Sequence, residues 1–307
     1  MFVPDNMDAF LQATAASLPL TTPTSVAPIP TVIPNVPIYQ HHHETGKRTL
    51  WVVAVLMGIS SLVFFTLAAR APLAKRVFHT TASLVTTLSF ITYLALAFGQ
   101  GIVYKHATVV HHHKHVPNTS EDLYRQVLWL RYLNWAISTP LILINLALVS
   151  GLPGANLIPA IVANFAMLGS GLLGTFAGNT PQRWVWLTVS CLSYLTMLHH
   201  GAFYAQRAAA NKDVKVRRFF GALSGTAFVA LALFPIGLAA GSLATKISVD
   251  AETIIYAVQD IFSQGILGYW LVLVQDSAQT SSLAVEGFWT SGFASEGSIR
   301  ITDEDGA

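Results

Sequence analysis

Apolar runs of helical length recur along the chain from Leu50 onward and are separated by short polar joints. The runs are continuous rather than alternating, which favours helices over half-buried strands. We predict helices over residues 49–70, 79–103, 126–150, 155–177, 183–206, 219–242 and 251–274. Each is close to the roughly 20 residues that cross the apolar part of a bilayer. The pattern therefore predicts a membrane domain over residues 47–275.

Composition strengthens this interpretation. Hydrophobic residues make up 53% of the 307 residues, charged residues make up 10%, and the mean hydropathy is +0.53. Soluble domains carry roughly 25% charged residues. We therefore expect an all-α integral membrane protein that is a bundle of seven transmembrane helices, with the lipid bilayer as its solvent. The single cysteine, Cys191, excludes an intrachain disulfide, and the dispersed basic residues argue against a nucleic-acid partner.

The loops and ends of the chain predict its orientation. Basic residues of short loops accumulate on the cytoplasmic side. The joint after the fifth predicted helix is the most basic, with Arg207, Lys212, Lys215, Arg217 and Arg218. We expect the N-terminus outside, the C-terminus in the cytoplasm, a disordered extracellular tail over residues 1–46 that is rich in Pro, Thr and Ser, and a cytoplasmic tail over residues 276–307.

Few ionisable residues fall inside the predicted helices, where a charge is costly. Asp260 lies within the seventh helix and Glu252 at its start, while Arg131 lies near the outer end of the third. We expect Arg131 and Asp260 to form an interior pair, directly or through water. Such a pair is either a structural contact between two helices or part of a path for transport or sensing, and the sequence leaves both open.

Two of these segments resemble a known family. The third predicted helix, from Arg131 to Asn145, reads RYLNWAISTPLILIN, and the seventh reads ETIIYAVQDIFSQ from Glu252 to Gln264. The first is similar to the pattern R-Y-x-D-W-x-x-T-T-P-L-x-L-x-D of microbial, type I rhodopsins, and the second to their E-T pair followed by an aspartate and a lysine. The resemblance covers about residues 50–275 and implies the seven-helix fold of that family.

The departures from the family pattern concern its chemistry. The resemblance implies that Gln264 stands where the family has the lysine that binds retinal, and an amide cannot form a Schiff base. Asn134 and Asn145 stand at the positions of the proton acceptor and donor, and an asparagine does not titrate near neutral pH. We therefore expect no covalent retinal, no cofactor, no proton pumping and no enzymatic activity.

Other side chains align with the retinal pocket of the family. They are Tyr93, Trp135, Ser138, Pro140, Trp186, Leu231, Phe234 and Leu238. The resemblance implies that Leu231 and Leu238 replace tryptophans, so that the aromatic wall is thinner than in a pump. The set is either ordinary bundle packing or the remnant of a pocket for an apolar ligand.

The chain resembles most a fungal branch of the family that lacks the retinal lysine, including heat-shock-induced plasma-membrane proteins of yeasts. This branch implies a non-photoactive, stress-linked regulator or chaperone at the plasma membrane, with partners such as a proton ATPase and possible oligomers. Two alternatives stay open. One is a light-independent ion or proton channel or transporter that uses Arg131 and Asp260, and the other is a receptor for a noncovalently bound apolar ligand.

The joint between the second and third predicted helices carries further candidate sites. Its histidines are His106, His111, His112, His113 and His115. Imidazoles bind Zn²⁺ and Cu²⁺ and titrate between about pH 5 and 8, so the joint is a candidate metal or pH sensor, or else a solvated polar loop. Asn118 begins an Asn-Thr-Ser sequon and is a candidate glycosylation site, with a chance tripeptide as the alternative.

Overall fold

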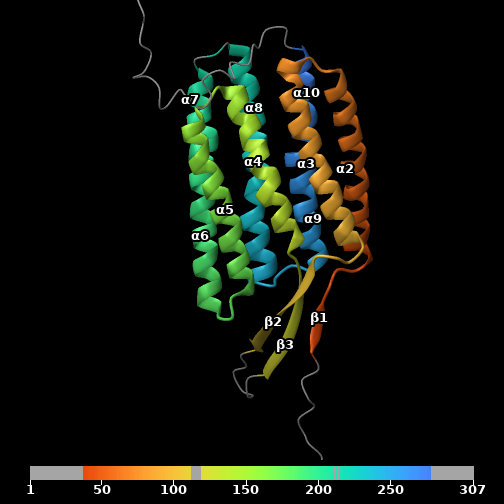
Figure 1. The fold of residues 1–307 in the computed structure, drawn as a ribbon. Helices are drawn as coiled ribbons and strands as arrows, with labels where there is room; N and C mark the ends of the chain where they lie inside the picture. Colours follow the sequence, from red (N-terminus) through yellow and green to blue (C-terminus); the bar gives the residue numbers. More distant parts are fainter. Residues whose placement is uncertain (1–36, 112–118, 211, 213, 278–307) are drawn as a thin grey trace, which may run out of the picture. The chain divides into compact units, whose positions relative to one another are not determined.

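The computed structural model describes residues 37–111, 119–210, 212 and 214–277 (Figure 1). Its helical elements are α2 (Glu44–Arg70), α3 (Leu73–Ala97), α4 (Leu130–Ser150), α5 (Gly154–Phe176), α6 (Thr180–Leu198), η1 (His199–Tyr204), α7 (Ala205–Ala210), α8 (Val214–Gly237), η2 (Leu238–Leu243), α9 (Val249–Asp260), η3 (Ile261–Ile266) and α10 (Leu267–Ser277). The π-helical segments η1, η2 and η3 continue their neighbours without a break. The described chain therefore forms seven helical crossings, as predicted.

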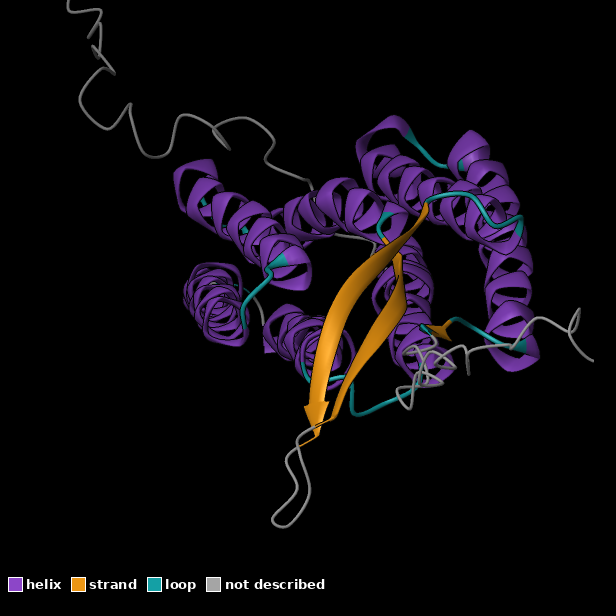
Figure 2. Cartoon of the chain, turned by 90° about the horizontal axis from the view of Figure 1, so that it is seen from below, coloured by secondary structure: helices purple, strands orange, loops and turns teal. Residues whose placement is uncertain are grey.

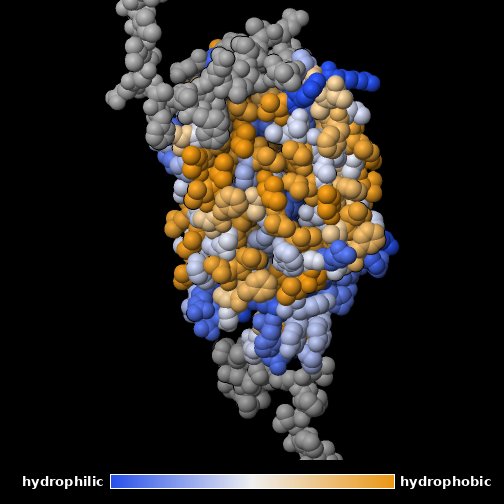
Figure 3. Space-filling view, in the orientation of Figure 1, coloured by the Kyte–Doolittle hydropathy of each residue, from blue (hydrophilic) through white to orange (hydrophobic). Residues whose placement is uncertain are grey.

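The surface of the bundle fits a bilayer. Among the described helices, 5 are long and apolar enough to cross a membrane, and they lie at Glu44–Arg70, Arg76–Ala97, Leu130–Ser150, Gly154–Phe176 and Val214–Leu243. Large apolar side chains such as Leu62 and Val229 point outward and are 68% and 72% exposed. Figure 3 shows apolar residues over the length of the helices and hydrophilic residues gathered at the end with the strands. The protein is thus an integral membrane protein.

A small sheet, which was not predicted, lies at one end of the bundle; we call this end the sheet end. It contains β1 (Ile38–Gln40), β2 (Ile102–His111) and β3 (Thr119–Leu128) in the order β1-β3-β2. β2 and β3 are antiparallel and β1 is parallel to β3. Seen from the sheet end, the hairpin lies across the ends of the helices (Figure 2).

The sheet corrects three predicted boundaries. The second helix ends at Ala97 rather than 103, because Gly99 and Gly101 have φ angles of +82° and +70°, conformations that glycine adopts freely and that end a helix. The third helix begins at Leu130 rather than 126, since the residues before it pair in β3. Residues 38–46 form β1 and the start of α2 rather than a tail. Residues 1–36 of that tail, and all of the C-terminal tail from 278 onward, lie outside the described residues.

Candidate functional site

The carboxylate of Asp260, at the end of α9, is fully buried in the bundle. Tyr93 Oη donates a hydrogen bond to its Oδ2 at 2.6 Å, and Trp135 Nε1 donates one to Oδ1 at 2.6 Å. Gln264 Nε2 donates to the same Oδ1 at 3.0 Å. A buried carboxylate is costly unless donors surround it. Three neutral donors from α3, α4 and η3 therefore stabilise Asp260.

Gln264 connects this carboxylate to a second polar group. Its Oε1 accepts hydrogen bonds from Ser89 Oγ and from Asn134 Nδ2, the latter at 3.4 Å. Ser89 and Asn134 also contact each other at 3.3 Å. Gln264 is 2% exposed and lies in η3, the π-helical segment that begins directly after Asp260. Such π-helical turns re-aim side chains and are frequent at functional sites. We call Ser89, Tyr93, Asn134, Trp135, Asp260 and Gln264 the interior cluster.

An aromatic wall adjoins the interior cluster. The ring of Trp135 meets the ring of Phe234 edge to face at 5.3 Å between centroids, and the ring of Tyr256 at 5.0 Å. Gly171 on α5 makes room for the wall, because a Cβ there would lie 2.7 Å from Phe234 Cζ and 3.2 Å from Leu238 Cδ2. The wall is therefore packed across α4, α5, α8 and α9.

The structure brings together most of the predicted pocket residues. Tyr93, Trp135, Ser138, Leu231, Phe234 and Leu238 are all buried. Among the described residues, Ser138 Oγ is a buried atom without a hydrogen-bond partner. Pro140 and Trp186 are half-buried, and Trp186 packs its Cβ against Gly174 of α5. These two residues lie at the margin of the set rather than in its buried centre.

The structure shows no direct ion pair between the described residues Arg131 and Asp260, and a pairing through water stays a prediction. Neutral donors occupy both oxygens of the carboxylate. Arg131 instead places its guanidinium carbon 4.9 Å from the centre of the Tyr256 ring, a cation–π contact. Its Nε and Nη2 have no hydrogen-bond partner within the described chain. The arginine is thus held by an aromatic ring.

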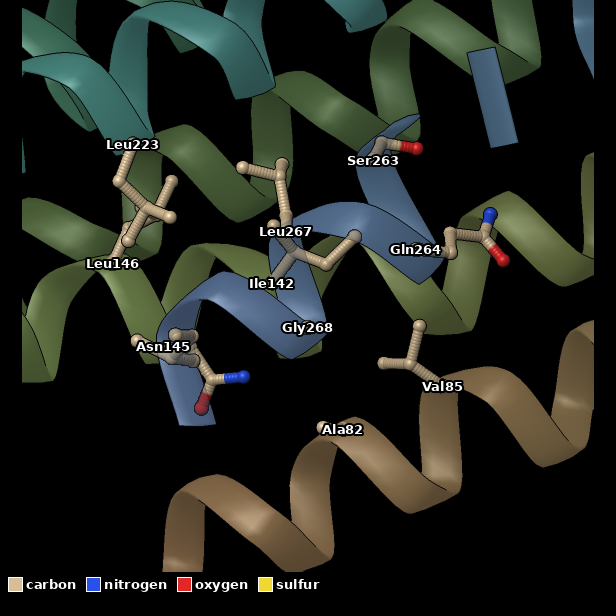
Figure 4. A pocket seen from close by; sticks show the side chains of 11 residues that line it. Ala82, Val85, Ile142, Asn145, Leu146, Leu223, Ser263, Gln264, Leu267 and Gly268 are labelled. Atoms are coloured by element: carbon tan, nitrogen blue, oxygen red, sulfur yellow. The ribbon is translucent and has the colours of Figure 1, made fainter. Parts of the chain in front are cut away.

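A narrow cavity runs from the interior cluster toward the end opposite the sheet. Its volume is about 30 Å³, enough for about one or two water molecules. Figure 4 shows Gln264 and Asn145 at its margins with the apolar side chains of Ile142 and Leu267 between them. Thr81 Oγ1 donates a hydrogen bond to Asn145 Oδ1 at 2.7 Å. Asn145 is therefore satisfied locally, and the lining between the two amides is apolar.

A separate cluster of polar side chains lies at the sheet end and was not predicted. Arg125 of β3 is 1% exposed, and its Nη2 donates to Glu252 Oε2 at 2.7 Å. Ser242 Oγ donates to Glu252 Oε1 at 2.7 Å, and Lys105 Nζ donates to the Ser242 carbonyl at 3.4 Å. Burial, and then the positive charges of Arg183 and Arg125, lower the pKa of Lys105 to about 8. We call Lys105, Arg125, Ser242 and Glu252 the sheet-end cluster.

The candidate metal and glycosylation residues are only partly described. His106 Nε2 lies 3.1 Å from Asp122 Oδ1 in the hairpin, and His111 ends β2. His112, His113, His115 and Asn118 lie outside the described residues. Within the described chain, no three His, Cys, Asp or Glu side chains are already arranged to hold a metal ion. Metal binding by this joint stays a prediction.

The fold and the interior cluster together define a seven-helix membrane protein with a buried carboxylate, an amide cluster and an aromatic wall at its centre. The sequence model of the family described as "Bacteriorhodopsin-like protein" matches residues 45–277. The chain therefore belongs to the microbial rhodopsin family, as the motifs on α4 and α9 indicated. Members of this family are mainly light-driven pumps or sensors and not enzymes in the usual sense.

Individual relatives agree. "Opsin-1" of Neurospora crassa is 38% identical over 309 residues, which is 99% of this chain and 100% of the relative. "Opsin-like protein carO" of Fusarium fujikuroi is 24% identical and covers 74% of this chain and 72% of its own length. The crystal structure of a light-driven proton pump from Leptosphaeria maculans matches with a TM-score of 0.76 and 37% identity, over 78% of this chain and 98% of that chain.

These comparisons contradict the prediction of a non-photoactive protein without a cofactor. A relative that matches along its whole length is named an opsin, and the solved structure is a light-driven proton pump. The protein is thus to be regarded as a rhodopsin, and retinal is the expected cofactor. The prediction was wrong because it rested on three substituted residues, Gln264, Asn134 and Asn145. The match of the chain to the family extends over residues 45–277.

The residues of the interior decide how retinal could be held. The described seventh crossing, residues 249–277, contains no lysine, so the amide of Gln264 cannot be the point of attachment. The aromatic wall and the interior cluster supply the apolar and polar contacts that an elongated apolar molecule with one polar end requires. The cavity of about 30 Å³ is far below the roughly 300 Å³ of ligand pockets, so side chains must move to admit it.

Proposed function

We propose that this protein is a retinal-binding rhodopsin in which the interior cluster holds the polar end of retinal by hydrogen bonds. One observation carries this proposal. Gln264 and Trp135, a member of the aromatic wall, donate to the same oxygen of Asp260, while Gln264 Oε1 accepts from Asn134; an oxygen of retinal would replace one of these internal partners. Retinal would supply the absorption of light. Gln264 and Ser89 would bind its oxygen, and Trp135 and Phe234 would pack along its chain.

A binding experiment tests the proposal. All-trans retinal is added to the purified full-length protein, unbound retinal is removed, and bound retinal is quantified before and after borohydride reduction. We expect about one retinal per protein, and no reduced adduct on a peptide of the seventh crossing. Trp135→Leu should weaken binding at least tenfold, because it removes part of the wall. Trp184→Leu is the matched control, since Trp184 is 45% exposed on α6. Absence of binding, or equal binding by both variants, contradicts the proposal.

A lysine introduced at position 264 sharpens this test. Gln264→Lys places an amine where an amide nitrogen now lies 3.0 Å from Asp260 Oδ1, so that the carboxylate would stabilise a protonated Schiff base. We expect a band shifted to the visible that hydroxylamine removes. Gln259→Lys is the control, because Gln259 is 1% exposed on the same crossing and its side-chain oxygen has no hydrogen-bond partner among the described residues, whereas Gln264 donates to Asp260. Equal pigment in both variants would mean that the site lies elsewhere.

We further infer that the membrane is the plasma membrane and that partners there, such as a proton ATPase, bind the protein. The resemblance to the fungal branch supports both inferences. Asn118 would be glycosylated during transport to the plasma membrane. A fluorescent fusion observed together with a plasma-membrane marker tests the location. Cross-linking in native membranes followed by identification of the captured proteins tests the partner, and retention in internal membranes would overturn the location.

A further inference from the structure

Two histidines lie side by side where β1 leads into α2. His41 and His43 are two residues apart in an extended segment, so their side chains lie on the same side of the chain. Their ring centroids are 5.1 Å apart with an angle of 30° between the planes. We propose that His41 and His43 together bind a divalent transition-metal ion, with Zn²⁺ as the probe. This site is separate from the interior cluster.

The spacing of the rings agrees with a shared metal ion. A Zn–N distance of about 2.0–2.1 Å places the centre of an imidazole ring roughly 3.2 Å from the metal. Two rings at the tetrahedral angle then have centroids roughly 5.2 Å apart. The separation of 5.1 Å in the structure is therefore compatible with two imidazoles on one Zn²⁺.

Asp250 at the start of α9 fixes one of the two rings. His43 Nδ1 lies 3.1 Å from Asp250 Oδ2, while the backbone amides of His43 and Gly46 donate to Asp250 Oδ1 at 2.8 and 3.0 Å. A carboxylate on one ring nitrogen sets the tautomer and makes the other nitrogen a better ligand. In His43 this leaves Nε2 as the metal-binding atom. The same arrangement of a carboxylate behind a histidine is common around protein-bound zinc.

The site opens to a groove with room for further ligands. The groove has a volume of about 490 Å³ and is lined by residues that include His41, His43, Glu44 and Lys47. Glu44 is the oxygen ligand nearest in sequence, and water can complete the coordination. Because no three such side chains are already placed for a metal among the described residues, we assign two protein ligands. The positive charge of Lys47 repels a metal cation in the groove, so Lys47→Gln should strengthen zinc binding severalfold.

Zinc titration of the full-length protein tests the site. The parent carries His111→Ala, His112→Ala, His113→Ala and His115→Ala, which removes the other dense group of histidines. Binding is followed by calorimetry and by competition with a coloured chelator. We expect one Zn²⁺ per protein at pH 7.5. His41→Ala and His43→Ala should each weaken it at least tenfold, and binding should weaken at pH 5.5, because a metal-bound imidazole must be neutral.

Two further variants separate the site from a general loss of structure. Asp250→Asn keeps an oxygen for the two backbone amides but loses the acceptor for His43 Nδ1, so we expect binding to weaken about 10-fold to 100-fold with little change in melting temperature. His106→Ala, at an exposed histidine of the hairpin, should leave binding unchanged. The proposal fails if the parent binds no zinc, or if His41→Ala and His43→Ala bind zinc as the parent does.

Discussion

Glu252 and Asp260 lie eight residues apart in the seventh crossing and are stabilised in different ways. Glu252 pairs with Arg125 at 2.7 Å and accepts a further hydrogen bond from Ser242. Asp260 makes no ion pair with a described residue and is surrounded by the neutral donors Tyr93, Trp135 and Gln264. Glu252 thus depends on an ion pair with an arginine of the sheet, and Asp260 on three hydrogen bonds within the bundle.

The difference predicts how each region responds to change. A buried ion pair is strongly destabilised when one partner is removed, because the other charge stays buried. A carboxylate held by several donors loses less when one of them goes. The sheet-end cluster should therefore depend on single residues and on pH, whereas the interior cluster should tolerate single losses.

The largest effect is expected from Arg125→Ala. This change leaves Glu252 buried without its cation and also removes the hydrogen bonds to Gln40 and to the Ile247 carbonyl. We expect a loss of about 3–5 kcal/mol in the free energy of unfolding, measured by denaturation in mixed micelles. Arg48→Ala, at an exposed arginine of α2, is the control and should change stability by about 0.5 kcal/mol or less. A loss of less than about 1 kcal/mol in the free energy of unfolding of Arg125→Ala would contradict the view that Glu252 depends on its ion pair.

The helices could be predicted from sequence, but the sheet could not. Helical periodicity and apolar length are local signals, so the seven crossings follow from the runs themselves. The hairpin depends on pairs such as Lys105 with Arg125, and β1 pairs with a strand 85 residues further along the chain. Apolar residues such as Val103 continue the hydrophobic run of the second helix, and only Gly99 and Gly101 could have indicated where it ends.

The site was also only partly predictable. The family motif located Asp260, Gln264 and Asn134, which the structure joins in one cluster. Ser89 was missed, because a serine within an apolar helix carries no signal of its own. The pairing of Arg125 with Glu252 was also missed, since the two residues are 127 positions apart in the sequence. The prediction of function was wrong because it rested on the substitutions at Gln264, Asn134 and Asn145.

Asp260→Ala tests the interior half of the comparison. It leaves the donors of Tyr93, Trp135 and Gln264 without an acceptor in a buried site, at a cost of about 1 kcal/mol or more each. We expect a loss of about 3 kcal/mol in the free energy of unfolding. Asp260→Asn, which keeps the shape and one acceptor oxygen, should lose about 1 kcal/mol. If both variants lose equally, the charge rather than the hydrogen bonds matters, and the two regions are alike.

The pH dependence of stability sharpens the sheet-end half. The pKa of Lys105 is about 8 in the folded protein, against an ordinary value of 10.5 that the unfolded chain keeps. Between these values the unfolded chain binds more protons, so stability rises with pH, whereas below pH 8 both states are protonated and the cost of burial is constant. At about 1.4 kcal/mol per pKa unit, the full rise is about 3.5 kcal/mol, and about 3 kcal/mol of it falls between pH 7 and pH 10.5.

Lys105→Met should remove this rise and stabilise the protein at pH 7. The measurement is the free energy of unfolding of both proteins from pH 7 to pH 10.5. Lys47→Met is the matched control, because Lys47 is exposed on α2 and should leave the pH profile unchanged. Parallel profiles for the parent and Lys105→Met would show that the lysine is not buried as a cation near Arg125.

The smallest effect separates the hydrogen bonds of the interior by the charge of their acceptor. Tyr93→Phe removes a bond of 2.6 Å to the Asp260 carboxylate, whereas Tyr256→Phe removes one of 3.4 Å to the Phe234 carbonyl. Bonds to a charged group contribute about 1.5–3 kcal/mol and neutral ones about 0.5–1.5 kcal/mol. Because two donors stay on Asp260, we expect about 1.5 kcal/mol for Tyr93→Phe and about 0.5 kcal/mol for Tyr256→Phe. Equal losses of stability in Tyr93→Phe and Tyr256→Phe would mean that Asp260 is protonated in the folded protein. Of the two carboxylates compared, only Glu252 would then be charged.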